Sequence, residues 1–174
     1  MAAPLIVTGE LPAALQTRAE ALRRAHYPPE RNVVAAHVTL FHALPPFVEE
    51  EARALLAALA SATPPPEARL AQVMDLGTGT AFRIESAELL DLRDRIAEHF
   101  HGMLTQQDTP RLRLHVTVQN KVERAEAHAL QAELALGFRP ENFCFAGLAL
   151  HRYLGGPWEP AGRWSFRGNT KSRR

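Results

Sequence analysis

The sequence has a single cysteine and no long apolar run. With only Cys144 among 174 residues, no intramolecular disulfide can form. Cys144 lies in the apolar run NFCFAGLAL, which predicts an inert buried thiol. The first residues, MAAPLIVTGELP, lack a basic region, and no stretch approaches the roughly 18 apolar residues of a membrane span. These absences favour a cytoplasmic protein without membrane contact.

An excess of charge of either sign is also absent. Lys and Arg number 20 against 19 Asp and Glu, a net charge of +1, which argues against a nucleic-acid binder held by bulk electrostatics. A balanced total charge does not exclude a local basic cleft. Residues 169–174 are predicted to form a basic tail. Neither His-Glu-x-x-His nor paired-cysteine spacing occurs, so we expect no metal and no cofactor.

Apolar periodicity and turn residues divide the remaining chain into helices and strands. Helices are predicted from Leu11 to the YPPE segment, over 48–59, after a Ser86 cap, and over 123–136. Strands are predicted at 4–9, 33–41, in a hairpin over 68–85 with Gly77 and Gly79 at its turn, and at 111–119, 142–154 and 163–168.

The order strand, helix, histidine-containing strand, helix occurs twice, with His37 and His115 lying 78 residues apart. This repetition predicts an α+β class and a bilobal duplicated fold with pseudo-two-fold symmetry. Two antiparallel sheets would line a central cleft, with the helices outside. We expect one domain of two lobes, about 1–62 and 67–168, between which strands can be exchanged.

Each histidine stands in a His-Val-Thr step within an apolar run, HVTL at 37–40 and HVTV at 115–118. Strand side chains alternate between faces, so His37 shares a face with Thr39, and His115 shares one with Thr117. The alternative interpretation is that the two histidines are unrelated and only make hydrogen bonds to the backbone. Their matched positions in the two halves of the chain disfavour this interpretation. The pattern predicts two imidazoles and two hydroxyls facing each other across the cleft.

Such a set suits attack at a phosphodiester. One imidazole serves as general base and the other as general acid, while hydroxyl and guanidinium donors hold the phosphoryl oxygens. Arg113, one same-face step from His115, could add positive charge; an ordinary solvated arginine is the alternative.

The two motifs resemble the paired His-x-Thr-x signatures of the 2H phosphoesterase superfamily, in particular its bacterial 2′-5′ RNA ligase-like branch, which includes RNA 2′,3′-cyclic phosphodiesterases. The resemblance implies that His37 and His115 are the catalytic pair, with His115 as base and His37 as acid, and that Thr39 and Thr117 bind phosphate. It implies metal-independent opening of 2′,3′-cyclic phosphates of RNA ends or small cyclic nucleotides to 2′-phosphates, with 2′-5′ joining as the reverse reaction. A monomer is expected.

Several further residues are candidates for binding the substrate. Many relatives have an arginine soon after the second motif, where this chain has Gln119-Asn120-Lys121. The candidate substrate-binding residues are Phe41, Arg113, Gln119, Lys121 and Tyr153, with Trp158 as a lid, His151 at the cleft rim and His42 at a strand end. The alternative function is a non-catalytic nucleotide- or RNA-end-binding protein that uses the same cleft.

Overall fold

The computed structural model describes residues 2–170, so positions 171–174 of the predicted basic tail lie outside the described residues. The four helices are α1 (Ala13–His26), α2 (Glu49–Ala62), α3 (Ala87–His99) and α4 (Arg124–Gly137). The strands are β1 (Leu5–Glu10), β2 (Val38–Leu44), β3 (Glu67–Asp75), β4 (Thr80–Glu85), β5 (His115–Gln119), β6 (Glu141–Cys144), β7 (Gly147–Tyr153) and β8 (Trp158–Ser165).

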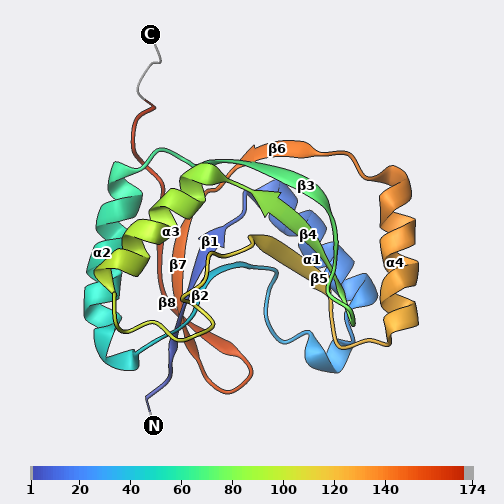
Figure 1. Ribbon diagram of the computed structural model, residues 1–174, viewed down its shortest axis with the longest axis horizontal. Helices are drawn as coiled ribbons and strands as arrows, with labels where there is room; N and C mark the ends of the chain where they lie inside the picture. Colours follow the sequence, from blue (N-terminus) through green and yellow to red (C-terminus); the bar gives the residue numbers. More distant parts are fainter. Residues whose placement is uncertain (1, 171–174) are drawn as a thin grey trace.

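The strands form two four-stranded antiparallel sheets, which confirms the α+β prediction. The first sheet has the order β2-β1-β7-β8 and the second has the order β5-β4-β3-β6. Figure 1 shows α2 and α3 at one end of the molecule and α1 and α4 at the other. β7 and β8, which come late in the chain, therefore complete the sheet that β1 and β2 begin.

The helices begin and end close to their predicted positions. Ser86 caps α3, since its hydroxyl accepts a hydrogen bond from the Leu89 N–H. Three glutamates stand in the first turn of α2, where they face the positive end of its dipole. Within residues 2–170, no helix is both long and apolar enough to cross a membrane.

The run 142–154 is two strands in different sheets, and the prediction of one strand was wrong. The chain crosses over at Phe145, whose N–H donates to Pro66 O, and at Ala146, whose N–H donates to Glu10 O. A Cβ on Gly147 would lie 2.4 Å from the Trp164 carbonyl oxygen, so only glycine allows this close approach.

Cys144 is exposed, contrary to the predicted buried thiol. Phe143 and Phe145 on either side of it pack inward against each other, with ring centroids 5.1 Å apart. Because side chains alternate along a strand, Cys144 points to the opposite, solvent side.

Candidate active site

The two motif strands meet although they belong to different sheets. β2 and β5 approach each other with Cα atoms within 8 Å, and Figure 1 shows them side by side in the middle of the molecule. The strands are shorter than predicted, because β2 begins at Val38 and β5 begins at His115. His37 thus stands one residue before β2, and His115 is the first residue of β5.

Both imidazole rings are held in the same way. His37 Nδ1 lies 2.7 Å from the carbonyl oxygen of Ala35, and His115 Nδ1 lies 2.8 Å from that of Arg113. A carbonyl can only accept, so each Nδ1 carries the proton and donates it. Each Nε2 is therefore left to take up or release a proton, as acid–base catalysis requires.

The surroundings of His37 favour its neutral form. Burial lowers the pKa of His37 to about 4, although its bond to Ala35 acts in the opposite direction. The positive charge of Arg23 and the nearby His151 and His115 lower it further. At neutral pH His37 Nε2 consequently offers a lone pair.

A β-bulge interrupts the alternation of β2 directly after the motif threonine. Thr39 pairs with Thr8 of β1, but the next pair along the strands is Phe41 with Val7, which leaves Leu40 as the extra residue. Phe41 therefore takes the face of Val7, and both side chains are fully buried. The prediction that Phe41 shares the face of the motif histidine was wrong.

β5 carries the equivalent bulge. Thr117 pairs with Ala81 of β4, and the next pair is Gln119 with Thr80, so Val118 is the extra residue. Gln119 is 1% exposed, and its Oε1 accepts a hydrogen bond of 2.9 Å from the Thr80 hydroxyl. Gln119 is thus a buried structural residue, which corrects its prediction as a substrate-binding one.

The register of the second sheet adds a residue that the sequence analysis missed. Arg83 of β4 pairs with His115 across the antiparallel ladder, so the two side chains share a face. The Arg83 guanidinium is 3.3 Å from Glu85, and both side chains are partly exposed. No sequence signal links Arg83 to His115, because their pairing depends on register.

Two buried arginines join the motifs, and we call them the arginine braces. Arg23 of α1 donates from Nη1 to Thr117 O and from Nε to Asn32 Oδ1, both at 2.9 Å. It thereby connects the second motif to the segment that leads into the first.

Arg93 of α3 makes the reciprocal connection. Its Nε donates to Leu40 O at 3.0 Å, and its Nη2 donates to Asp108 O. It connects the first motif strand to the loop that leads into the second. Each brace crosses from one motif to the other, which is the arrangement expected from pseudo-two-fold symmetry.

His42 was predicted to lie at a frayed strand end, but it is anchored. Its Nδ1 is 2.9 Å from Asp108 Oδ1, and the backbone N–H groups of His42 and Ala43 also donate to this carboxylate. Burial would raise the pKa of Asp108, but these hydrogen bonds hold it below its ordinary value. The Asp108 side chain is fully buried and ties the loop before β5 to the end of β2.

A cavity of about 990 Å³ lies beside His37 on the side of the first sheet. One wall is Trp158, whose ring centroid is 4.4 Å from that of His37 and 5.2 Å from that of His151. His151 Nε2 is 3.0 Å from the Thr8 hydroxyl, and burial lowers the pKa of His151. Trp158 and His151 therefore belong to the site, as walls of this cavity.

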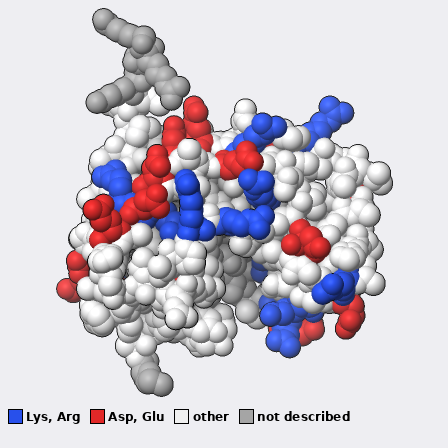
Figure 2. All heavy atoms as spheres, viewed as in Figure 1, with Lys and Arg blue, Asp and Glu red and all other residues white. Residues whose placement is uncertain are grey.

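Of the other candidates, Arg113 and Tyr153 are exposed, and Tyr153 pairs with Trp158 without lining the cavity. Figure 2 shows a hollow between the two halves of the molecule, with Lys and Arg side chains gathered along its upper border. Among residues 2–170, no three His, Cys, Asp or Glu side chains are grouped closely enough to hold a metal ion.

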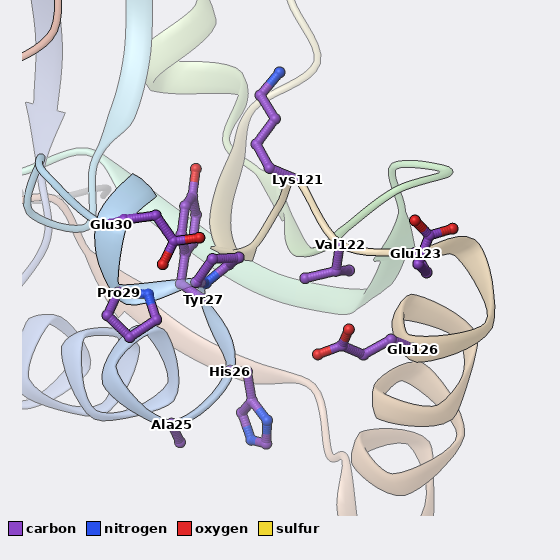
Figure 3. Close-up of a pocket in the computed structure, with 10 residues that line it drawn as sticks. Ala25, His26, Tyr27, Pro29, Glu30, Lys121, Val122, Glu123 and Glu126 are labelled. Atoms are coloured by element: carbon purple, nitrogen blue, oxygen red, sulfur yellow. The ribbon is translucent and has the colours of Figure 1, made fainter.

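Lys121 follows β5 in a left-handed conformation, with φ of 60°, and borders a second hollow of about 530 Å³. In Figure 3, Lys121 rises away from this hollow, whereas Glu126 of α4 points toward it. Glu30 and Glu123 also line the hollow. Three carboxylates make the hollow unfavourable for phosphate, and neither motif histidine lines it.

A family model described as the 2′-5′ RNA ligase superfamily matches residues 11–157. The chain belongs to this superfamily. Membership supports an enzyme that acts on phosphodiester bonds and agrees with the resemblance carried by the two motifs. No curated protein sequence is significantly similar to the chain.

Solved structures share the fold of this superfamily member. TT0787 of Thermus thermophilus superposes with a TM-score of 0.66 at 19% identity, over 96% of this chain and 100% of the other. LigT of E. coli, complexed with 3′-AMP, superposes with a TM-score of 0.60 at 19% identity, over 95% and 99% of the two chains.

Proposed function

We propose that the protein is a metal-independent phosphodiesterase that opens a 2′,3′-cyclic phosphate to a 2′-phosphate. The observation that carries the proposal is the pair of motif histidines, each with Nδ1 bound to the carbonyl two residues earlier and Nε2 free. Binding alone would not need two imidazoles prepared identically. The alternative, a non-catalytic RNA-end-binding protein, leaves this duplication unexplained.

In the proposed reaction one imidazole removes a proton from water as its oxygen bonds to phosphorus. The P–O3′ bond breaks, and the other imidazole gives its proton to the departing O3′. The hydroxyls of Thr39 and Thr117 donate to the phosphoryl oxygens, on which negative charge accumulates in the transition state. If a 5′-hydroxyl replaced water as the nucleophile, the same sequence would join the 2′,3′-cyclic phosphate end to it as a 2′-5′ phosphodiester, with O3′ again leaving as the hydroxyl.

The low pKa of His37 supports His37 as the base and His115 as the acid. His37 is unprotonated at neutral pH and can accept a proton at once. This order is the reverse of the one implied by the family resemblance, and we adopt it for this chain.

The substrate proposed is an RNA end or a nucleotide. Structures of E. coli LigT with 3′-AMP, NADP+ and ATP give a precedent for nucleotides in this fold. In our proposal a similar ligand binds to this protein with its phosphate between His37 and His115.

The test is incubation of the purified protein with 2′,3′-cyclic nucleotides in excess EDTA, followed by separation of the 2′- and 3′-phosphates. We expect a 2′-phosphate product, and His37→Ala and His115→Ala should each reduce kcat by orders of magnitude. His101→Ala, at an exposed histidine of the described chain, is the matched control. Unchanged turnover in either motif variant would refute the mechanism, and activity lost only in EDTA would indicate a metal hydrolase.

A further inference from the structure

The walls of the cavity beside His37 carry little positive charge. Its only lysine or arginine among the lining residues is Arg163. Arg163 is paired with Glu10, with Nε–Oε1 at 2.7 Å and Nη2–Oε2 at 2.6 Å. Since the charge of this arginine is balanced by the carboxylate of Glu10, which also lines the cavity, the cavity is poorly suited to a phosphate and well suited to an uncharged part of a ligand.

The cavity contains a flat aromatic wall next to the proposed reaction centre. Trp158 contacts the His37 ring at 4.4 Å and is held there by the β7–β8 hairpin, where it pairs with Tyr153. Aromatic side chains beside single-stranded nucleic acid stack on bases, whatever the sequence of the bases. A base attached to a phosphate at His37 would lie against Trp158.

The cavity is longer than one base requires. Its lining includes both Gly147 and His151 of β7, four residues apart, which corresponds to about 13 Å along a strand. Stacked bases are separated by about 3.4 Å. Its volume, about 990 Å³, stands at the upper end of the range of roughly 300 to 1,000 Å³ for small-molecule pockets.

We propose that this cavity binds two successive nucleosides at the 3′ end of an RNA, so that the preferred substrate is an oligonucleotide end and not a free cyclic nucleotide. The inference rests on the proposed function. The terminal base stacks on Trp158, and the preceding nucleoside occupies the portion toward Gly147. Because the one arginine on the walls is paired with Glu10, the second nucleoside contributes through stacking and apolar contact.

The experiment compares kcat/KM for a 2′,3′-cyclic mononucleotide with that for a dinucleotide carrying the same cyclic end, at low and high salt. We expect the dinucleotide to be preferred by about 5-fold to 100-fold, the range that one stacked base provides. The preference should change little with salt, whereas a contact to the added phosphate would weaken as salt rises.

Trp158→Ala should lower kcat/KM for both substrates by a similar factor, because both place their terminal base on Trp158, and Trp158→Phe should retain most of the rate, with melting temperatures checking that both variants fold. Phe47→Ala is the matched control, because Phe47 is 79% exposed and does not line the cavity. Equal rates for the two substrates, a preference that disappears in salt, or an unchanged kcat/KM in Trp158→Ala would overturn the inference. Failure to hydrolyse either substrate would instead refute the proposed function.

Discussion

Arg23 and Thr117, from opposite halves of the chain, are joined by a hydrogen bond of 2.9 Å from the arginine Nη1 to the threonine carbonyl oxygen. Arg23 is 2% exposed, and its Nε–H donates a hydrogen bond of the same length to Asn32 Oδ1. This brace sets the second motif against the segment entering the first. We therefore expect Arg23 to act as a positioning residue for the histidine pair.

Replacing Arg23 with lysine should damage catalysis more than binding. Lysine keeps the charge but cannot donate in two fixed directions, so the motifs would shift relative to each other. We expect kcat to fall about 10-fold to 100-fold with KM little changed, since small misplacements of reacting groups are costly. Arg24→Lys, at an exposed neighbour on α1, is the control. A variant that melts lower but keeps its kcat would show that the brace is structural only.

Stability should depend on pH through His37. Its pKa is about 4 in the folded state against an ordinary 6.5, so the unfolded chain binds more protons between these values. The free energy of unfolding should consequently decrease as pH falls from about 6.5 to about 4. Urea unfolding of the wild type and His37→Asn across this range measures the effect, and the variant should show a flatter dependence.

The same group should appear in the kinetics. The acid limb of kcat/KM reports the base of the free enzyme, which places it near pH 4 if His37 is that base. A limb between pH 6 and 7 would contradict the assignment of His37 as base.

Phe41→Ala should destabilise the fold without a specific effect on substrate. Phe41 is fully buried, and the Arg93 guanidinium lies 4.7 Å from its ring centroid. Truncating a buried phenylalanine costs about 3 to 5 kcal/mol. Chemical denaturation measures the loss, and KM at a temperature where the variant is folded should match the wild type. A large rise in KM with intact stability would restore Phe41 to the substrate site.

Asp108→Asn should loosen the loop before β5. Asparagine places an NH2 group near N–H donors of His42 and Ala43, so at least one buried donor loses its acceptor, at about 1 to 3 kcal/mol. Because the folded-state pKa of Asp108 is below 3.8, its carboxylate stabilises the fold above that pH, and the contribution is lost as pH falls through the lower folded value.

Thermal melts at pH 7 and pH 3 test this expectation. The difference between wild type and Asp108→Asn should be large at pH 7 and smaller at pH 3, with Asp91→Asn as an exposed control on α3. An equal difference at both pH values would mean that the charge of Asp108 is irrelevant.

Strand alternation predicts which polar residues share a face up to each threonine. His37 with Thr39 and His115 with Thr117 follow from a period of two, and the spacing of 78 predicts their pairing. The alternation fails one residue later, at the bulges of Leu40 and Val118, which also lie 78 residues apart. A bulge depends on the register of the neighbouring strand, and the sequence of one strand contains no sign of it.

The arginine braces and the cavity could not be predicted from the sequence, for a related reason. Arg23 and Arg93 look like ordinary helix arginines, and only tertiary packing reveals that both are buried against motif backbone. Trp158 was predicted as a lid residue and His151 as a rim residue because the run 142–154 gives no indication of where β6 ends and β7 joins the other sheet.

The sequence by itself determined the groups on which the proposed chemistry rests: two imidazoles and two hydroxyls in matched motifs, supported by helices whose apolar stripes and caps are local features. The tertiary structure decided which neighbours complete the site, with Phe41 and Gln119 turned inward and Trp158, Arg83 and the braces brought near. The physical reason is the distance along the chain over which each effect acts. Periodicity and capping act over a few residues, whereas register, sheet exchange and the burial of a guanidinium depend on segments that lie far apart in the chain.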